Sequence, residues 1–99
     1  MDYDSKYSFL GNPKSDTICG TKRGGCFQQF DKGFVYQTST TGAYAIYGGM
    51  YDKWETIGKE WGVLGYPTSN EYSSGGKIIQ NFEFGKMAWA AGTGAVIEN

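Results

Sequence analysis

Two kinds of hydrophobic pattern follow one another along this chain. In the first, short runs rich in aromatic and β-branched residues are separated by turns that contain glycine, which is typical of strands joined in hairpins. The pattern predicts strands at 26–30, 34–38 and 43–47, and again at 77–82, 86–90 and 95–98. Each set predicts a meander of two or three strands. We expect Gly33 and Gly85, which end the hairpin turns, to have a positive φ.

The second pattern has a helical period and lies between the two sets of strands. Apolar residues recur there at i, i+4, i+7 and i+11, namely Met50, Trp54, Ile57 and Trp61. This stripe predicts a helix over 49–61, although Gly58 disfavours it, so a short or broken helix is the alternative. Since a small sheet is marginal by itself, we expect both tryptophans to pack on the strands. The expected fold is α+β, mostly β, with two small β-meander units joined by one short helix.

The two sets of strands belong to copies of one sequence unit. Leu10–Asp16 recurs 54 residues later as Leu64–Asn70, and Gln28–Gly33 recurs 52 residues later as Gln80–Gly85. We therefore expect a tandem-repeat module that forms a single domain over the whole chain. The unit boundaries predicted from the match are about 7–63, with the linking helix included, and about 64–99, which ends before a helix of its own.

The first unit has a longer turn, and this turn holds both cysteines of the chain, Cys19 and Cys26. The segment 20–25 between them contains three glycines and can double back tightly. We interpret the pair as a disulfide that closes a small loop, which would indicate an oxidising compartment. Two buried or free thiols in a cytosolic protein are the alternative.

The second unit carries the motifs of a known repeat in their order and spacing. They are Leu64-Gly-Tyr-Pro67, Ser69-Asn-Glu71, Gly75-Gly76, Gln80-Asn-Phe82-Glu-Phe-Gly85, Trp89 and Thr93-Gly-Ala95. Together they resemble the LGFP repeat. The first unit departs from that pattern at Asn12, Thr17 and Gln37.

This resemblance implies a non-catalytic module of secreted or envelope proteins that retains them on cell-wall glycan of the peptidoglycan or arabinogalactan type. Catalysis in such proteins belongs to other domains. The family's arrays are similar to closed rings with more units than this chain has. The resemblance therefore implies either part of a longer array or a homo-oligomer that completes a ring. A self-assembling or protein-interaction module is the alternative function.

Composition narrows the chemistry that the chain supports. It has no histidine, which excludes nucleophilic catalysis of the Ser–His or Cys–His kind. A small hydrolase with a carboxylate pair is a distant third function, with the turn acids as candidates: Asp16, Asp31, Glu71 and Glu83. We expect neither enzymatic activity nor a cofactor nor a metal, with a Ca²⁺ site in the turn 69–71 as the alternative. The net charge of −1 gives no basis for binding nucleic acid, and no apolar run approaches the ~20 residues that insert into a membrane.

Aromatic residues make up 17% of the chain and direct attention to glycan binding. A sugar needs an aromatic face for its C–H surface and amide or carboxylate groups for its hydroxyls. The ligand-binding residues predicted in the second unit are Trp89, Gln80, Asn81, Glu71 and Tyr66. Their counterparts in the first unit are Tyr36, Gln28 and Asp16. We expect the site in a groove between units; the alternative is that Trp89 and Tyr36 are core residues and that the glutamines tie down turns.

Overall fold

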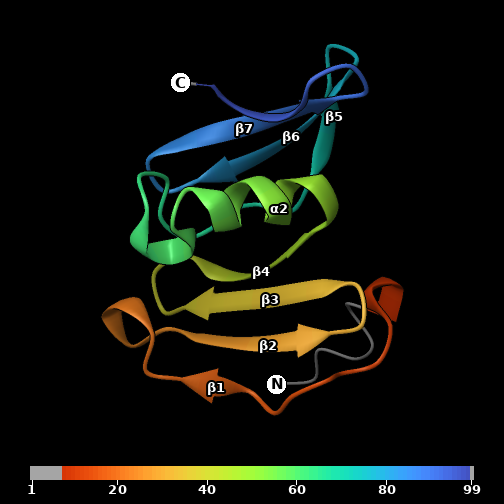
Figure 1. Ribbon diagram of the computed structural model, residues 1–99. Helices are drawn as coiled ribbons and strands as arrows, with labels where there is room; N and C mark the ends of the chain where they lie inside the picture. Colours follow the sequence, from red (N-terminus) through yellow and green to blue (C-terminus); the bar gives the residue numbers. More distant parts are fainter. Residues whose placement is uncertain (1–7, 99) are drawn as a thin grey trace.

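The computed structural model describes residues 8–98, so the predicted beginning of the first unit at about residue 7 and the last residue of the second lie outside the described residues. The chain forms two four-stranded antiparallel sheets with an α-helix between them (Figure 1). The first sheet, in the order β1-β2-β3-β4, consists of β1 (Ile18–Cys19), β2 (Cys26–Phe30), β3 (Gly33–Thr38) and β4 (Gly42–Tyr47). The second, in the order β5-β6-β7-β8, consists of β5 (Tyr72–Ser74), β6 (Lys77–Phe82), β7 (Gly85–Ala90) and β8 (Gly94–Glu98). Helix α2 spans Gly48–Thr56.

These elements confirm the predicted fold class, a mostly β tandem repeat with one linking helix. The six long strands lie within one residue of their predicted bounds. The expected number of strands in each meander was wrong, because β1 and β5 add a fourth strand to each sheet. They are only two and three residues long and exposed throughout, so no alternation of apolar and polar residues marks them in the sequence.

The linking segment is a broken helix, so the continuous helix over 49–61 was wrong and the broken alternative holds. After α2, Gly58 adopts a left-handed conformation with φ of 107°, and a 3₁₀ turn, Lys59–Trp61, follows. This break turns Trp61 away from the apolar stripe, so its side chain is 67% exposed whereas Trp54 is fully buried. The expectation that both tryptophans pack on the strands was therefore wrong for Trp61.

Gly33 is needed for close approach rather than for a positive φ. Neither Gly33 nor Gly85 has a positive φ, contrary to the prediction. A Cβ on Gly33 would lie 2.5 Å from the Cβ of Tyr47 in the neighbouring strand, so only glycine fits there. A positive φ occurs instead at Gly65, at 73°, in the corner that leads into the second sheet.

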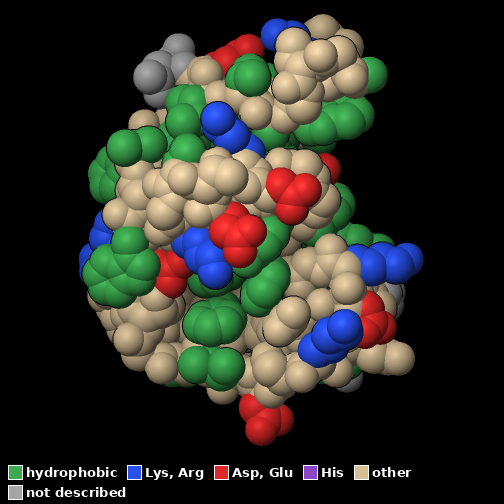
Figure 2. All heavy atoms as spheres, in the orientation of Figure 1, with side chains coloured by type: hydrophobic (Ala, Val, Ile, Leu, Met, Phe, Trp, Pro, Cys, Tyr) green, Lys and Arg blue, Asp and Glu red, His purple; other side chains and the backbone are tan. Residues whose placement is uncertain are grey.

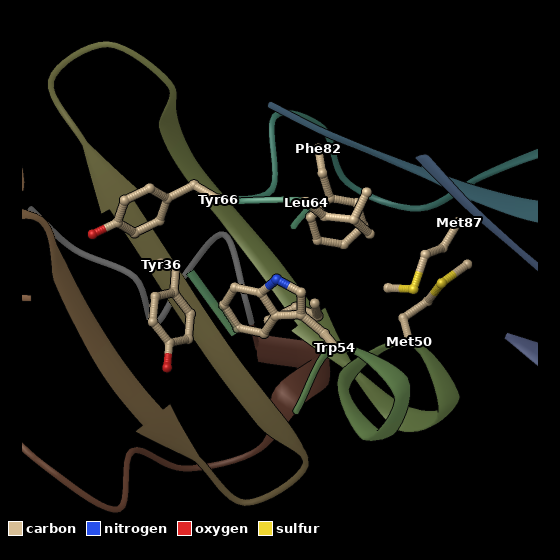
Figure 3. Packing of buried hydrophobic residues seen from close by; sticks show 8 residues of the cluster. Tyr36, Met50, Trp54, Leu64, Tyr66, Phe82 and Met87 are labelled. Atoms are coloured by element: carbon tan, nitrogen blue, oxygen red, sulfur yellow. The ribbon is translucent and has the colours of Figure 1, made fainter. Parts of the chain in front are cut away.

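The main hydrophobic core lies on both sides of α2. The ring centroid of Trp54 is 4.8 Å from that of Tyr36 in the first sheet and 6.2 Å from that of Phe82 in the second. Figure 3 shows Met50 of α2 and Met87 of β7 pointing toward one another beside these rings. The helix thus supplies the apolar layer that joins the two sheets.

A second, smaller core covers the opposite face of the first sheet. It consists of Leu10, Phe30, Val35 and Ala45. Leu10 and Phe30 correspond in the repeat to Leu64 and Phe82, which belong to the main core. Each unit therefore uses the same sheet face for the same purpose, to pack on what precedes it.

Cys19 and Cys26 form a disulfide, as interpreted from the sequence. The loop that it closes reaches across to the second unit. The hydroxyl of Thr21 donates a hydrogen bond to Glu60, and the hydroxyl of Tyr66 donates one to the carbonyl of Lys22. The disulfide loop therefore holds the first sheet against the linker and against the corner that leads into the second sheet.

Candidate functional site

A cavity of about 230 Å³ opens at the junction of the two units. One wall is the end of β4 and the first turn of α2, and the other is the face of the second sheet that looks toward the helix. The lining residues are Tyr47, Gly48, Gly49, Met50, Glu71, Ile78 and Trp89. Because both units contribute a wall, the cavity exists only when they are docked.

Trp89 supplies the aromatic surface of this cavity. It lies on β7 opposite Ile78 in the register, so both side chains project from the same sheet face. The indole lies close against the backbone of Gly49, since a Cβ there would be 2.8 Å from the indole Nε1. Trp89 remains 37% exposed, which leaves ring surface for a ligand.

Glu71 and Tyr47 supply the polar side of the cavity. Burial raises the pKa of the Glu71 carboxyl above its usual value, and a hydrogen bond with Tyr47 partly offsets this rise. Burial also raises the pKa of the Tyr47 hydroxyl, and the nearby Glu71 raises it further. A carboxylate in hydrogen-bond contact with a phenol is a group that binds the hydroxyls of a neutral ligand.

The start of α2 adds backbone donors to the same wall. The first N–H groups of a helix have no acceptor within the helix. Here the N-cap residue is Tyr47, whose side chain makes no capping hydrogen bond. The side chain of the N-cap residue therefore does not satisfy the amides of the first turn, which begins with Gly48 and Gly49 on the cavity wall.

The structure brings two of the predicted second-unit residues, Trp89 and Glu71, into this one cavity, and places Gln80 and Asn81 elsewhere. Gln80 is fully buried, and its Nε2 donates to the carbonyls of Ala45 and Ser69, each at 2.9 Å. Asn81 follows it on β6 and so faces the opposite side of the sheet, where its Oδ1 accepts a hydrogen bond from Tyr72 at 3.0 Å. The glutamine therefore ties down a turn, as the alternative interpretation held.

Tyr66 and Tyr36 are both core residues, 0% and 3% exposed. Tyr36 packs edge-to-face on Trp54, and burial raises the pKa of its hydroxyl well above the ordinary range. Neither ring presents a face to a sugar, so the prediction that they bind a ligand does not fit their burial. Tyr36 lies in β3, where side chains alternate between core and surface, and Tyr66 lies in the corner before β5, so the sequence alone did not assign either ring to a face.

The remaining first-unit candidates, Asp16 and Gln28, line a shallow hollow on the surface with Pro13, Lys14 and Ser15. Gln28 pairs with Val35 in the register, so it lies on the opposite face of the sheet from Tyr36. The predicted trio of the first unit is therefore separated. No aromatic ring lines this hollow.

Two of the four carboxylates proposed for a hydrolase, Asp31 and Glu83, are engaged in structural contacts. Asp31 accepts a hydrogen bond from the amide of Asn12 at 3.0 Å, and Glu83 accepts one from the amide of Tyr66 at 3.0 Å. In the turn considered for Ca²⁺, the side-chain oxygens of Ser69 and Asn70 accept hydrogen bonds from backbone amides at 3.0 and 3.1 Å. Among residues 8–98 no three of the acidic or cysteine side chains gather as a metal site would require.

Five of the seven lining residues were not predicted from the sequence: Tyr47, Gly48, Gly49, Met50 and Ile78. The signal that points to them is the position of the Gly48-Gly49 pair, where the last strand of one unit gives way to the linking helix. Ile78 follows from the β6–β7 register once the hairpin at Glu83 is fixed.

One face of the molecule carries charges of both signs (Figure 2). On the face seen in Figure 2, Lys and Arg side chains alternate with Asp and Glu, and apolar side chains reach the surface in small groups. No helix of the described chain is long and apolar enough to cross a bilayer.

Comparison with known proteins assigns both units to one repeat. A family model described as the LGFP repeat matches residues 10–62 and, a second time, residues 64–97. The two matches meet at the corner between the linker and the second sheet, which is where the sequence repeat begins again. None of the curated proteins compared with the chain matches it.

Proposed function

The chain belongs to the LGFP repeat family, a non-catalytic repeat typical of cell-surface proteins, and from that premise we propose that it retains its protein on envelope polysaccharide through the cavity at Trp89. The observation that carries the proposal is the meeting of Trp89 and Glu71 in one cavity at the unit junction. An indole face packs on the C–H surface of a sugar, while a carboxylate and backbone amides bind its hydroxyls.

The size of the cavity favours a short ligand. At about 230 Å³ it is smaller than most pockets for drug-sized molecules, which measure roughly 300–1,000 Å³. It therefore suits one sugar residue or the end of a branch rather than a long stretch of chain. Longer polysaccharide would pass over the rim, where Glu71 and the edge of the indole are accessible.

Retention without turnover agrees with the chemistry of the site. Hydrolysis of a glycosidic bond requires two carboxyl groups placed across it. Glu71 is the one carboxylate among the residues that line the cavity. A location on the cell surface agrees with the disulfide, since such bonds persist in oxidising compartments.

The test is a pull-down of the purified chain on insoluble envelope polysaccharide. We expect the wild type to be retained and Trp89→Ala to lose at least tenfold in affinity. Trp61→Ala is the matched control, because Trp61 is 67% exposed and lies outside the cavity. Equal retention of Trp89→Ala and wild type, or loss of retention in Trp61→Ala alone, would contradict this site.

A further inference from the structure

The two units are joined by a contact in which side chains of one unit bind a strand edge of the other. Ala45 lies in β4, the edge strand of the first sheet. Its amide donates to Asn70 Oδ1 at 3.1 Å, and its carbonyl accepts from Gln80 Nε2 at 2.9 Å. Both partners belong to the second unit, where Gln80 Nε2 also donates to Ser69. The result is a polar cradle for the backbone of one strand residue.

The first unit contains the same cradle. Gln28 Nε2 donates to the carbonyl of Ser15 at 3.0 Å, as Gln80 does to Ser69. The amide of Gln29 donates to Ser15 Oγ at 3.1 Å, as Asn81 does to Ser69 Oγ at 3.0 Å. Asp16 stands where Asn70 stands in the second unit. We call Ser15, Asp16 and Gln28 the first-unit cradle.

This first-unit cradle is exposed at its centre. Asp16 is exposed and Gln28 half-buried, and both line the shallow hollow on the surface. Within residues 8–98 no backbone group occupies the position that Ala45 has in the other cradle. The second N–H of Gln28 and the carboxylate of Asp16 match a strand residue that offers one carbonyl and one amide.

The opposite end of the chain presents such a strand residue. Met87 pairs with Ile97 as Val35 pairs with Ala45, so Ile97 occupies in β8 the place of Ala45 in β4. Both strands are the last of their sheets. Since Ala45 directs its amide and carbonyl away from the sheet, the same register directs those of Ile97 outward. The edge at Ile97 is therefore the counterpart of the first-unit cradle.

We infer that two copies of this chain associate head to tail, with the β8 edge of one copy at Ile97 seated in the Ser15–Asp16–Gln28 cradle of the next. The interface is heterologous, so each copy binds one neighbour through its cradle and the other neighbour through its β8 edge. The inference concerns surfaces away from the cavity at Trp89 and stands independently of the glycan that the cavity takes.

The association does not require a second linking helix. In the internal junction α2 packs on Tyr36 and Ile46 of the first sheet. Ala88 and Glu98 occupy the corresponding places on the second sheet, so its outer face lacks the two large apolar side chains on which α2 packs in the first. The contact between copies therefore rests on the strand edge, and we expect it to be weaker than the internal junction.

The first measurement is sedimentation velocity of the chain over a range of concentrations. We expect reversible self-association that Gln28→Leu weakens at least tenfold. Asp16→Asn retains it, because it recreates the Asn70 group of the internal cradle. Gln29→Leu is the matched control, since this exposed glutamine adjoins the cradle but faces the other side of the sheet. A wild type that stays monomeric at its highest soluble concentration overturns the inference.

A mixing experiment tests the head-to-tail arrangement itself. Ile97→Pro removes the amide N–H that would donate a hydrogen bond to Asp16 of the next copy. Proline is tolerated on an edge strand where the N–H faces solvent. Gln28→Leu retains an intact β8 edge, and Ile97→Pro retains an intact cradle. Mixed in equal amounts, the two variants should form a one-to-one dimer that grows no further, although neither associates alone. Failure to form that dimer, with both variants folded by thermal unfolding, contradicts the assignment.

Discussion

Arg23 in the disulfide loop of the first unit forms an ion pair with Glu83 in the turn between β6 and β7 of the second unit. The hydrogen bond from Arg23 holds the pKa of the Glu83 carboxyl below its usual value. The guanidinium also lies over the ring of Tyr66, 5.5 Å from its centroid. Through these contacts the disulfide loop fixes one unit on the other. The corresponding turn of the second unit has no cysteines and so forms no such loop.

The disulfide should therefore contribute to stability through the loop that it closes. Replacing both Cys19 and Cys26 by alanine is expected to lower the free energy of unfolding by about 2–3 kcal/mol, the amount predicted for the closure of a short loop. Urea unfolding at neutral pH measures this change, with reduced wild type as the control. If the alanine variant and the reduced wild type both keep the free energy of unfolding of the oxidised wild type, the contacts of Thr21 and Arg23 hold the loop without the disulfide.

The sequence predicted most of the fold because the repeat supplied the strands twice. Each long strand has its pattern of apolar residues, and the hairpin turns at Asp31 and Glu83 set the register. The sequence offered a break at Gly58 only as the alternative to a continuous helix, because a glycine within an apolar stripe weakens a helix without showing which way the chain turns. Trp61 was assigned to the core for that reason.

The site was predicted only in part, because its walls come from parts of the sequence far apart. Trp89 and Glu71 were recognised by their chemistry, and they do lie in one cavity. Tyr47 and Gly49 have no distinctive chemistry and become part of the site only through the docking of the units. Gln80 was misassigned because a buried amide that binds backbone carbonyls has the same sequence signal as one that binds a sugar.

Trp54 should be the side chain on which the joining of the sheets depends. Its Nε1 donates to the carbonyl of Gly65 at 3.0 Å inside the core. Trp54→Phe leaves this buried carbonyl without its donor, which is expected to lower the free energy of unfolding by about 1–3 kcal/mol. Trp61→Phe, a matched change at an exposed tryptophan, should leave it nearly unchanged. Comparable losses in the two variants, measured by urea unfolding, would contradict this role.

Gly49 separates the demands of binding from those of stability. A Cβ at this position would lie 2.8 Å from the indole Nε1 of Trp89, so Gly49→Ala should displace the ring and weaken glycan retention several-fold. Alanine also favours a helix over glycine, so the melting temperature should hold or rise. Gly92→Ala is the control, since nothing lies within 4 Å of its Cβ position. If Gly49→Ala is retained on the glycan as well as wild type, retention does not depend on the position of the Trp89 indole against Gly49.

Glu71 should make both stability and binding depend on pH. Its pKa is raised above 4.5 by burial in the folded state, so the folded chain keeps this proton to a higher pH than the unfolded chain does. The free energy of unfolding should therefore fall as the pH rises from 4.5 to the folded pKa, and Glu71→Gln should abolish this part of the pH dependence.

Glycan retention should change in the opposite direction over the same range, because the ionised carboxylate is the better acceptor for sugar hydroxyls. Wild type should thus bind more strongly above the folded pKa of Glu71, whereas Glu71→Gln should bind several-fold more weakly and without that rise. Thermal unfolding and pull-downs between pH 4 and 7 measure the two trends on the same samples. If the Gln variant keeps the pH dependence of wild type in retention, the titrating group lies elsewhere and Glu71 does not contact the ligand.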